Sequence, residues 1–128
     1  HWIYENPSHT REERSKKWME ILQEFSSPEV DFSGLDNYRA YHWQRQLHLY
    51  EVPFYYIEYG IAQLGAIGLW KQYKTDANKA INNYVNALKL GGMKTLPELY
   101  QAAELPFDFS PTYISELMTF VSGEIKKS

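Results

Sequence analysis

The sequence predicts an all-α protein of about six helices, with no sheet. Three observations support this class. Apolar residues recur at helical spacing, as in Trp18, Ile21, Leu22 and Phe25, whereas the alternating pattern of strands is almost absent. Glycine and proline fall between the helical patterns. A chain of 128 residues with 44% hydrophobic residues fits one domain with a real core.

The starts of several helices can be identified from residue types that stabilise a first turn. Thr10 and Glu13 have the spacing of a capping box, in which each side chain satisfies a backbone N–H of the other residue. Thr95 and Glu98 repeat the pattern. Pro53 lacks an N–H and holds a helical φ, so it suits the first turn of a further helix. These three positions therefore mark three predicted helix starts.

The remaining boundaries follow the same logic. Asp76 can cap a helix that stops at Gly91-Gly92, and Ser110 followed by Pro111 is an N-cap with proline in the first turn. The six predicted helices span approximately residues 11–26, 35–49, 53–73, 77–90, 96–103 and 111–126, and residues 1–5 form the end of a preceding helix.

Composition limits the classes of function. The formal net charge is -3 and no long basic block occurs, which argues against nucleic-acid binding. Cysteine is absent, which excludes disulfides and is compatible with the cytoplasm. The apolar stretch 52–70 approaches the length of a membrane span, but Glu58, Gln63 and several tyrosines favour a buried helix of a soluble protein, so we expect no membrane partner.

Residues 48–70 form the most unusual segment. The expected helix is apolar on every side and carries one charge, Glu58, which is typical of a central core helix or one that lines a cavity. Glycine inside a helix costs up to about 1 kcal/mol relative to alanine, so Gly60, Gly65 and Gly68 require an explanation. Close approach of neighbouring helices explains them most simply, and a ligand passing against the helix is the alternative.

Four side chains near the start of this segment could act together. On one helix Tyr55 and Tyr56 would each neighbour Tyr59, and a turn at Pro53 could fold His48 back over the helix start. Imidazole and phenol donors that converge can stabilise a developing oxyanion. The alternative is that these are core aromatics whose hydroxyls bond to their neighbours, and spacing alone favours that alternative.

A complete catalytic or metal site is missing from the sequence. Its histidines do not form HExxH or any pair at i, i+4, so we predict no metal site within the chain. A cysteine nucleophile, a GxSxG elbow and a phosphate-binding glycine loop are also absent.

The pattern HxxxxPFYYIxYxxAQLGAxxLW resembles the C-terminal part of oligoendopeptidase F, a zinc metallopeptidase family related to thimet oligopeptidase. The matching residues are His48, Pro53-Phe54-Tyr55-Tyr56-Ile57, Tyr59, Ala62-Gln63-Leu64-Gly65-Ala66 and Leu69-Trp70, supported by the segments 1–18, 34–48 and 84–105. The similarity extends over essentially the whole chain. It implies that residues 1–128 are the C-terminal helical part of a larger, mostly helical catalytic domain, whose N-terminal lobe and zinc motif are not in this sequence.

The resemblance also implies an activity. The parent enzyme would use zinc, held outside this chain, to hydrolyse internal bonds of short peptides in the cytoplasm. His48, Tyr55, Tyr56 and Tyr59 would bind the substrate, and His48 and Tyr59 would also stabilise the transition state. The expected partners are short peptides and the rest of the peptidase chain. The chain alone would be inactive, and its exposed apolar surface would favour self-association.

Two alternatives remain open at this stage. The chain could be an independent helical module for peptide binding or oligomerisation without catalysis. It could also belong to an inactive paralogue whose zinc motif has decayed. An upstream reading frame that contains HExxH would exclude both.

Overall fold

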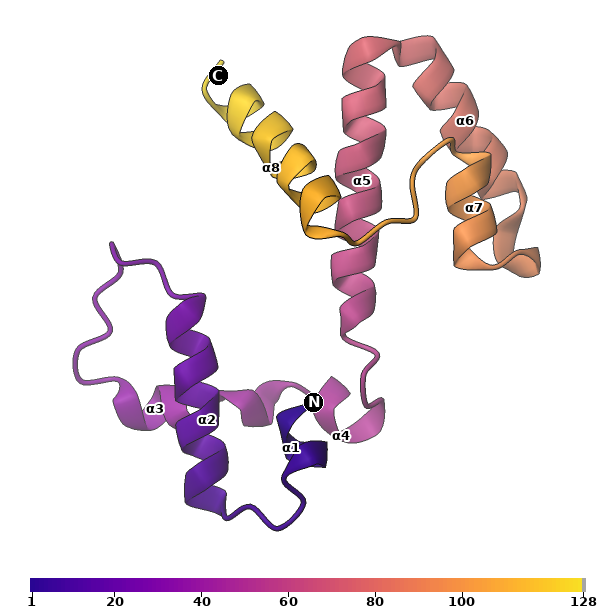
Figure 1. Ribbon diagram of the computed structural model, residues 1–128. Coiled ribbons are helices and arrows are strands. Elements are labelled where there is room, and N and C mark those ends of the chain that lie inside the picture. The colour runs from indigo at the N-terminus through magenta and orange to yellow at the C-terminus, as the bar shows by residue number, and fades with distance from the viewer. Residues whose placement is uncertain (128) are drawn as a thin grey trace. The chain divides into compact units, whose positions relative to one another are not determined.

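The computed structural model describes residues 1–127, and within them every regular element is helical (Figure 1). The all-α prediction is therefore confirmed. The chain forms two compact units, His1–Tyr56 and a second that begins at Ile57. The elements are α1 Trp2–Glu5, α2 Arg11–Glu24, α3 Asp36–Tyr41, η1 His42–Arg45, α4 His48–Glu51, α5 Ile57–Thr75, α6 Ala77–Lys89, η2 Gly91–Met93, α7 Leu96–Ala102 and α8 Pro111–Ile125.

In the first unit, α2 starts where the capping box predicts. The Thr10 N–H donates to the Glu13 carboxylate at 2.7 Å, and the Glu13 N–H donates to the Thr10 hydroxyl at 3.2 Å. The box satisfies two N–H groups that a helix start leaves without intrahelical partners. The backbone bond to Thr10 also lowers the pKa of Glu13, because it stabilises the carboxylate.

The single helix predicted over residues 35–49 is wrong, because the structure divides this region into α3, η1 and α4. The Arg39 carbonyl accepts the His42 N–H, which is the tighter bond of a 3₁₀ turn. It also accepts the Trp18 indole N–H at 2.9 Å. This bond from α2 holds the carbonyl where the regular helix ends. The 3₁₀ turn carries Trp43, which is 6% exposed and lies in the core of this unit.

In the second unit, α5 packs against α6 and α8, and α6 packs against α7 (Figure 1). The predicted caps form here as well. The Asp76 carboxylate accepts the Lys79 N–H at 3.0 Å, the Ser110 hydroxyl accepts the Tyr113 N–H, and Glu98 accepts the Thr95 N–H at 2.9 Å. Ala80, Ala103 and Leu117 form the buried centre.

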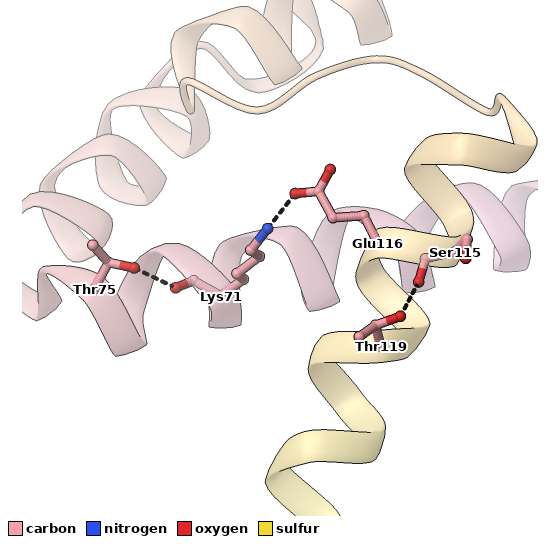
Figure 2. A network of polar contacts seen from close by, with 5 residues as sticks. All are labelled: Lys71, Thr75, Ser115, Glu116 and Thr119. Atoms are coloured by element: carbon pink, nitrogen blue, oxygen red, sulfur yellow. Dashed lines mark hydrogen bonds and ion pairs between the residues drawn. The ribbon is translucent and has the colours of Figure 1, made fainter.

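An ion pair joins α5 to α8 at the surface (Figure 2). The Lys71 ammonium meets the Glu116 carboxylate, and their side chains are 38% and 55% exposed. On the same helices the Thr75 hydroxyl donates to the Lys71 carbonyl, and the Thr119 hydroxyl donates to the Ser115 carbonyl at 2.8 Å. Exposed ion pairs of this kind contribute little to stability, so buried side chains rather than this pair hold the unit together.

The helix predicted to start at Pro53 instead begins at Ile57. The Val52 carbonyl accepts the Tyr55 N–H at 3.1 Å and closes a turn around Pro53. Phe54 has a φ of 65°, which no right-handed helix accepts. Tyr55 therefore belongs to a turn, and the helical spacing expected between Tyr55, Tyr56 and Tyr59 is wrong.

The prediction that the helix within residues 48–70 is buried is also wrong for the described chain. Gly68 is the buried residue of α5, whereas Ile57 is 67% exposed. An apolar sequence on every side of a helix indicates that something covers it, but it does not indicate which part of a protein supplies the cover.

Two of the three glycines in α5 permit close approach, as predicted. A Cβ on Gly65 would lie 2.5 Å from the Tyr100 hydroxyl oxygen, and a Cβ on Gly68 would lie 3.1 Å from Leu105. The Tyr100 hydroxyl donates to the Ile61 carbonyl at 2.6 Å. Burial raises the pKa of Tyr100, which keeps the phenol protonated as a donor. Gly60 has open space around it, so close packing does not explain that glycine.

We therefore expect Gly65→Ala and Gly60→Ala to change stability in opposite directions. Gly65→Ala forces Tyr100 away from Ile61 and should lower the free energy of unfolding by roughly 1–3 kcal/mol. Gly60→Ala adds a methyl group in open space and should raise it by roughly 0.5–1 kcal/mol, because alanine has the higher helix propensity. Urea denaturation measures both changes. Equal effects of the two substitutions would contradict this account of the glycines.

Candidate functional site

The turn after α4 brings His48 against Tyr56. The two ring centroids are 4.8 Å apart and the ring planes meet at 84°, an edge-to-face arrangement that aromatic rings favour. A turn at Pro53 was predicted to fold His48 back, and in the structure His48 does fold back, against Tyr56. An imidazole and a phenol thus lie side by side at the end of the first unit.

The local sequence explains this arrangement. Helix α4 is short and ends at Glu51, and the N–H of the next residue, Val52, donates to the His48 carbonyl. Pro53 then reverses the chain, since proline suits the second position of a turn. Phe54 occupies the third position with positive φ, which is normally a position for glycine. The reversal returns Tyr56 to the start of α4, where His48 lies.

Aromatic contacts hold both sides of the turn. Tyr50 of α4 stacks on the buried Trp43, with centroids 6.0 Å apart. The Phe54 ring packs on Tyr4 of α1, with centroids 4.9 Å apart. Sequence reasoning did not assign a role to Tyr4 or Phe54. Phe54 follows a proline in a turn, and this position could have indicated its positive φ. No local sequence feature marks Tyr4.

The three tyrosines predicted to bind substrate are accessible in this chain. Tyr55 and Tyr56 are each 50% exposed, and Tyr59, on the first turns of α5 in the second unit, is 59% exposed. Within this chain, therefore, these tyrosines do not lie in the core. Tyrosine combines an apolar ring with a hydroxyl donor, so accessible tyrosines suit contact with a polar chain such as a peptide.

The described residues do not fit a zinc ion. Across residues 1–127 no group of three or more His, Asp or Glu side chains could hold a metal. The sequence likewise contains no HExxH motif. A membrane-spanning helix is likewise not found in that part of the chain, where no helix is both long and apolar enough.

The helical fold and the sequence together define the protein class. Residues 1–119 match the sequence model described as Peptidase family M3, and the chain belongs to that family.

Individual relatives agree with this family. An "Oligoendopeptidase F homolog" of Borreliella burgdorferi is 29% identical over 84 residues, which cover 66% of this chain and 14% of the relative. An X-ray structure described as an oligoendopeptidase F superimposes with a TM-score of 0.87 and 33% identity, covering all of this chain and 23% of that one. The predicted resemblance is confirmed, and the chain spans less than a quarter of the length of either protein.

Proposed function

We propose that residues 1–128 are the C-terminal, substrate-binding part of the catalytic domain of a zinc-dependent oligoendopeptidase, which hydrolyses internal bonds of short peptides in the cytoplasm. The family match and the likeness to an oligoendopeptidase F over the whole chain support this proposal. The observation that carries it is the contact between His48 and Tyr56, since it joins two polar ring systems at the positions that the resemblance assigns to substrate binding.

The proposed roles follow from what these groups can donate. The His48 imidazole and the phenols of Tyr55 and Tyr56 hydrogen-bond the backbone of the bound peptide. The hydroxyl of Tyr59, together with His48, donates to the oxygen of the scissile carbonyl as negative charge develops on it. A donor that is already oriented toward that charge stabilises the transition state more than the bound substrate.

The proposed zinc ion would be bound by the complete peptidase. Here the complete peptidase means a chain in which an HExxH motif precedes this segment. When bound there, zinc would supply an activated water and a Lewis acid. Since the described residues 1–127 do not fit zinc, its ligands would lie elsewhere in that peptidase.

The rest of the peptidase chain is also a proposed partner. An apolar pocket of about 510 Å³ opens between α5, α6 and α7, and Glu58 is the charged residue in its lining. Its apolar lining includes Ile61, Leu69, Leu96 and Leu99. Apolar side chains of the remaining chain would remove this surface from water. Without them, we expect the isolated chain to self-associate.

The chain of residues 1–128 should be inactive by itself and should bind no zinc at catalytic affinity. A quenched fluorescent peptide measures cleavage, and metal analysis after dialysis against zinc measures binding. A mock purification from cells without the chain is the control for contaminating proteases. Cleavage that a chelator abolishes, in excess of that control, would refute the expectation and favour a complete site within the chain.

The second candidate, an independent helical binding module, makes a different prediction. It requires no HExxH upstream in the reading frame, and it requires peptide affinity in the isolated chain. The family match over residues 1–119 favours the peptidase.

A further inference from the structure

We propose that Phe54 and Tyr4 are positioning residues, which hold the turn that places Tyr56 against His48. This inference rests on the proposed function, because it assigns these two aromatics the task of orienting a substrate-binding pair. The contacts that carry it all lie within the first unit, from Tyr4 at one end to Tyr56 at the other.

The backbone of Phe54 is the first observation. Its φ of 65° lies in the left-handed region, where a Cβ crowds the following carbonyl. Bulky aromatic residues rarely occupy this region, and the third position of such a turn normally carries glycine or asparagine. Strain of this kind persists when the surrounding structure enforces it, and it is common at sites with a function.

The Tyr4 contact is the second observation. The Phe54 ring lies on the Tyr4 ring at 4.9 Å, with an angle of 31° between their planes. Phenylalanine therefore gives this turn a side-chain contact that glycine could not provide. Phe54 and Tyr4 are 64% and 57% exposed, so the contact buries little surface and adds little to a core. Its main consequence is geometric, since it holds the turn that brings Tyr56 against His48.

The opposite side of the turn is fixed independently. Tyr50 stacks on Trp43, which also lies under the Arg14 guanidinium at 5.1 Å. Helix α4 and its His48 are thereby attached to the core of the unit. Phe54 and Tyr4 then determine where Tyr56 lies relative to that fixed His48. Loss of either aromatic contact should leave the unit folded while the imidazole and the phenol lose their mutual orientation.

Kinetics of the complete peptidase test this proposal with two disruptive variants. Tyr4→Ala removes the supporting ring, and Phe54→Val introduces a branched side chain that disfavours positive φ. We expect each to lower kcat/KM by roughly ten- to a hundredfold, because small misplacements of binding groups have effects of this size. Tyr4→Phe keeps the ring and should retain activity. Phe25→Ala removes an aromatic that is 82% exposed and should also retain activity.

The same substitutions in a His48→Ala/Tyr56→Phe background separate positioning from general damage. A positioning residue has nothing left to orient there, so Tyr4→Ala and Phe54→Val should cause no further fall in kcat/KM. An equal fall in both backgrounds, or no fall with His48 and Tyr56 intact, would overturn the proposal. If Phe54→Val does not fold, as thermal unfolding would reveal, Tyr4→Ala decides the result. If the His48→Ala/Tyr56→Phe enzyme is fully active, the proposed function itself has failed, which is a distinguishable outcome.

Discussion

Replacing Tyr59 by phenylalanine in the complete peptidase should lower kcat by roughly 10²–10³ while KM stays nearly constant. The substitution removes one hydroxyl and keeps the ring, so the loss reflects a missing hydrogen bond rather than altered packing. We expect the effect on kcat because the proposed bond forms with charge that develops only in the transition state. Steady-state kinetics on a quenched fluorescent peptide give both constants.

Tyr73→Phe is the matched control for this experiment. Tyr73 lies on the same helix, α5, and is 48% exposed against 59% for Tyr59. It has no proposed role in catalysis, so its substitution should leave kcat unchanged. If both variants have the same kcat and KM as the unmodified enzyme, Tyr59 has no catalytic role and the proposal for it is wrong.

Leu117→Ala should lower the free energy of unfolding by roughly 2–5 kcal/mol. Leu117 of α8 is 1% exposed and lies in the buried centre of the second unit with Ala80 and Ala103. Because its buried neighbours are small, this leucine supplies much of the apolar side-chain volume there. Truncation to alanine removes those contacts and leaves a cavity that helix backbones cannot fill.

Met118→Ala provides the comparison for Leu117→Ala. Met118 is the adjacent residue on α8 but is 40% exposed, so its truncation should have a much smaller effect. Urea denaturation of the isolated chain measures both. Similar losses from Leu117→Ala and Met118→Ala would show that α8 does not pack as described.

Helix starts were predictable because their signals are local. Thr10, Asp76 and Ser110 cap backbone N–H groups within three residues of their own positions, so sequence spacing alone defines the geometry. The division of the predicted helix 35–49 was not predictable in this way. It involves a bond from Trp18 to the Arg39 carbonyl, which joins residues distant in the sequence.

The candidate site was predictable in part. Pro53 correctly indicated a break that returns the chain toward His48. The same proline suits either a first helical turn or a β-turn, and the left-handed Phe54 decided between them. Tyr55 and Tyr56 consequently lie outside the helix. Their exposure was also missed, because hydrophobicity indicates that a segment is covered in the intact protein but not whether this chain covers it.

Peptide affinity of the complete peptidase tests the proposed substrate-binding role most directly. Because the proposed activity needs zinc, a chelator should stop turnover, and calorimetric titration with a substrate peptide then gives Kd without cleavage. We predict that His48→Ala weakens this Kd by about tenfold, equivalent to the loss of one hydrogen bond to the peptide, whereas Phe25→Ala leaves it unchanged. An unchanged Kd for His48→Ala would contradict the assignment of this segment to substrate binding.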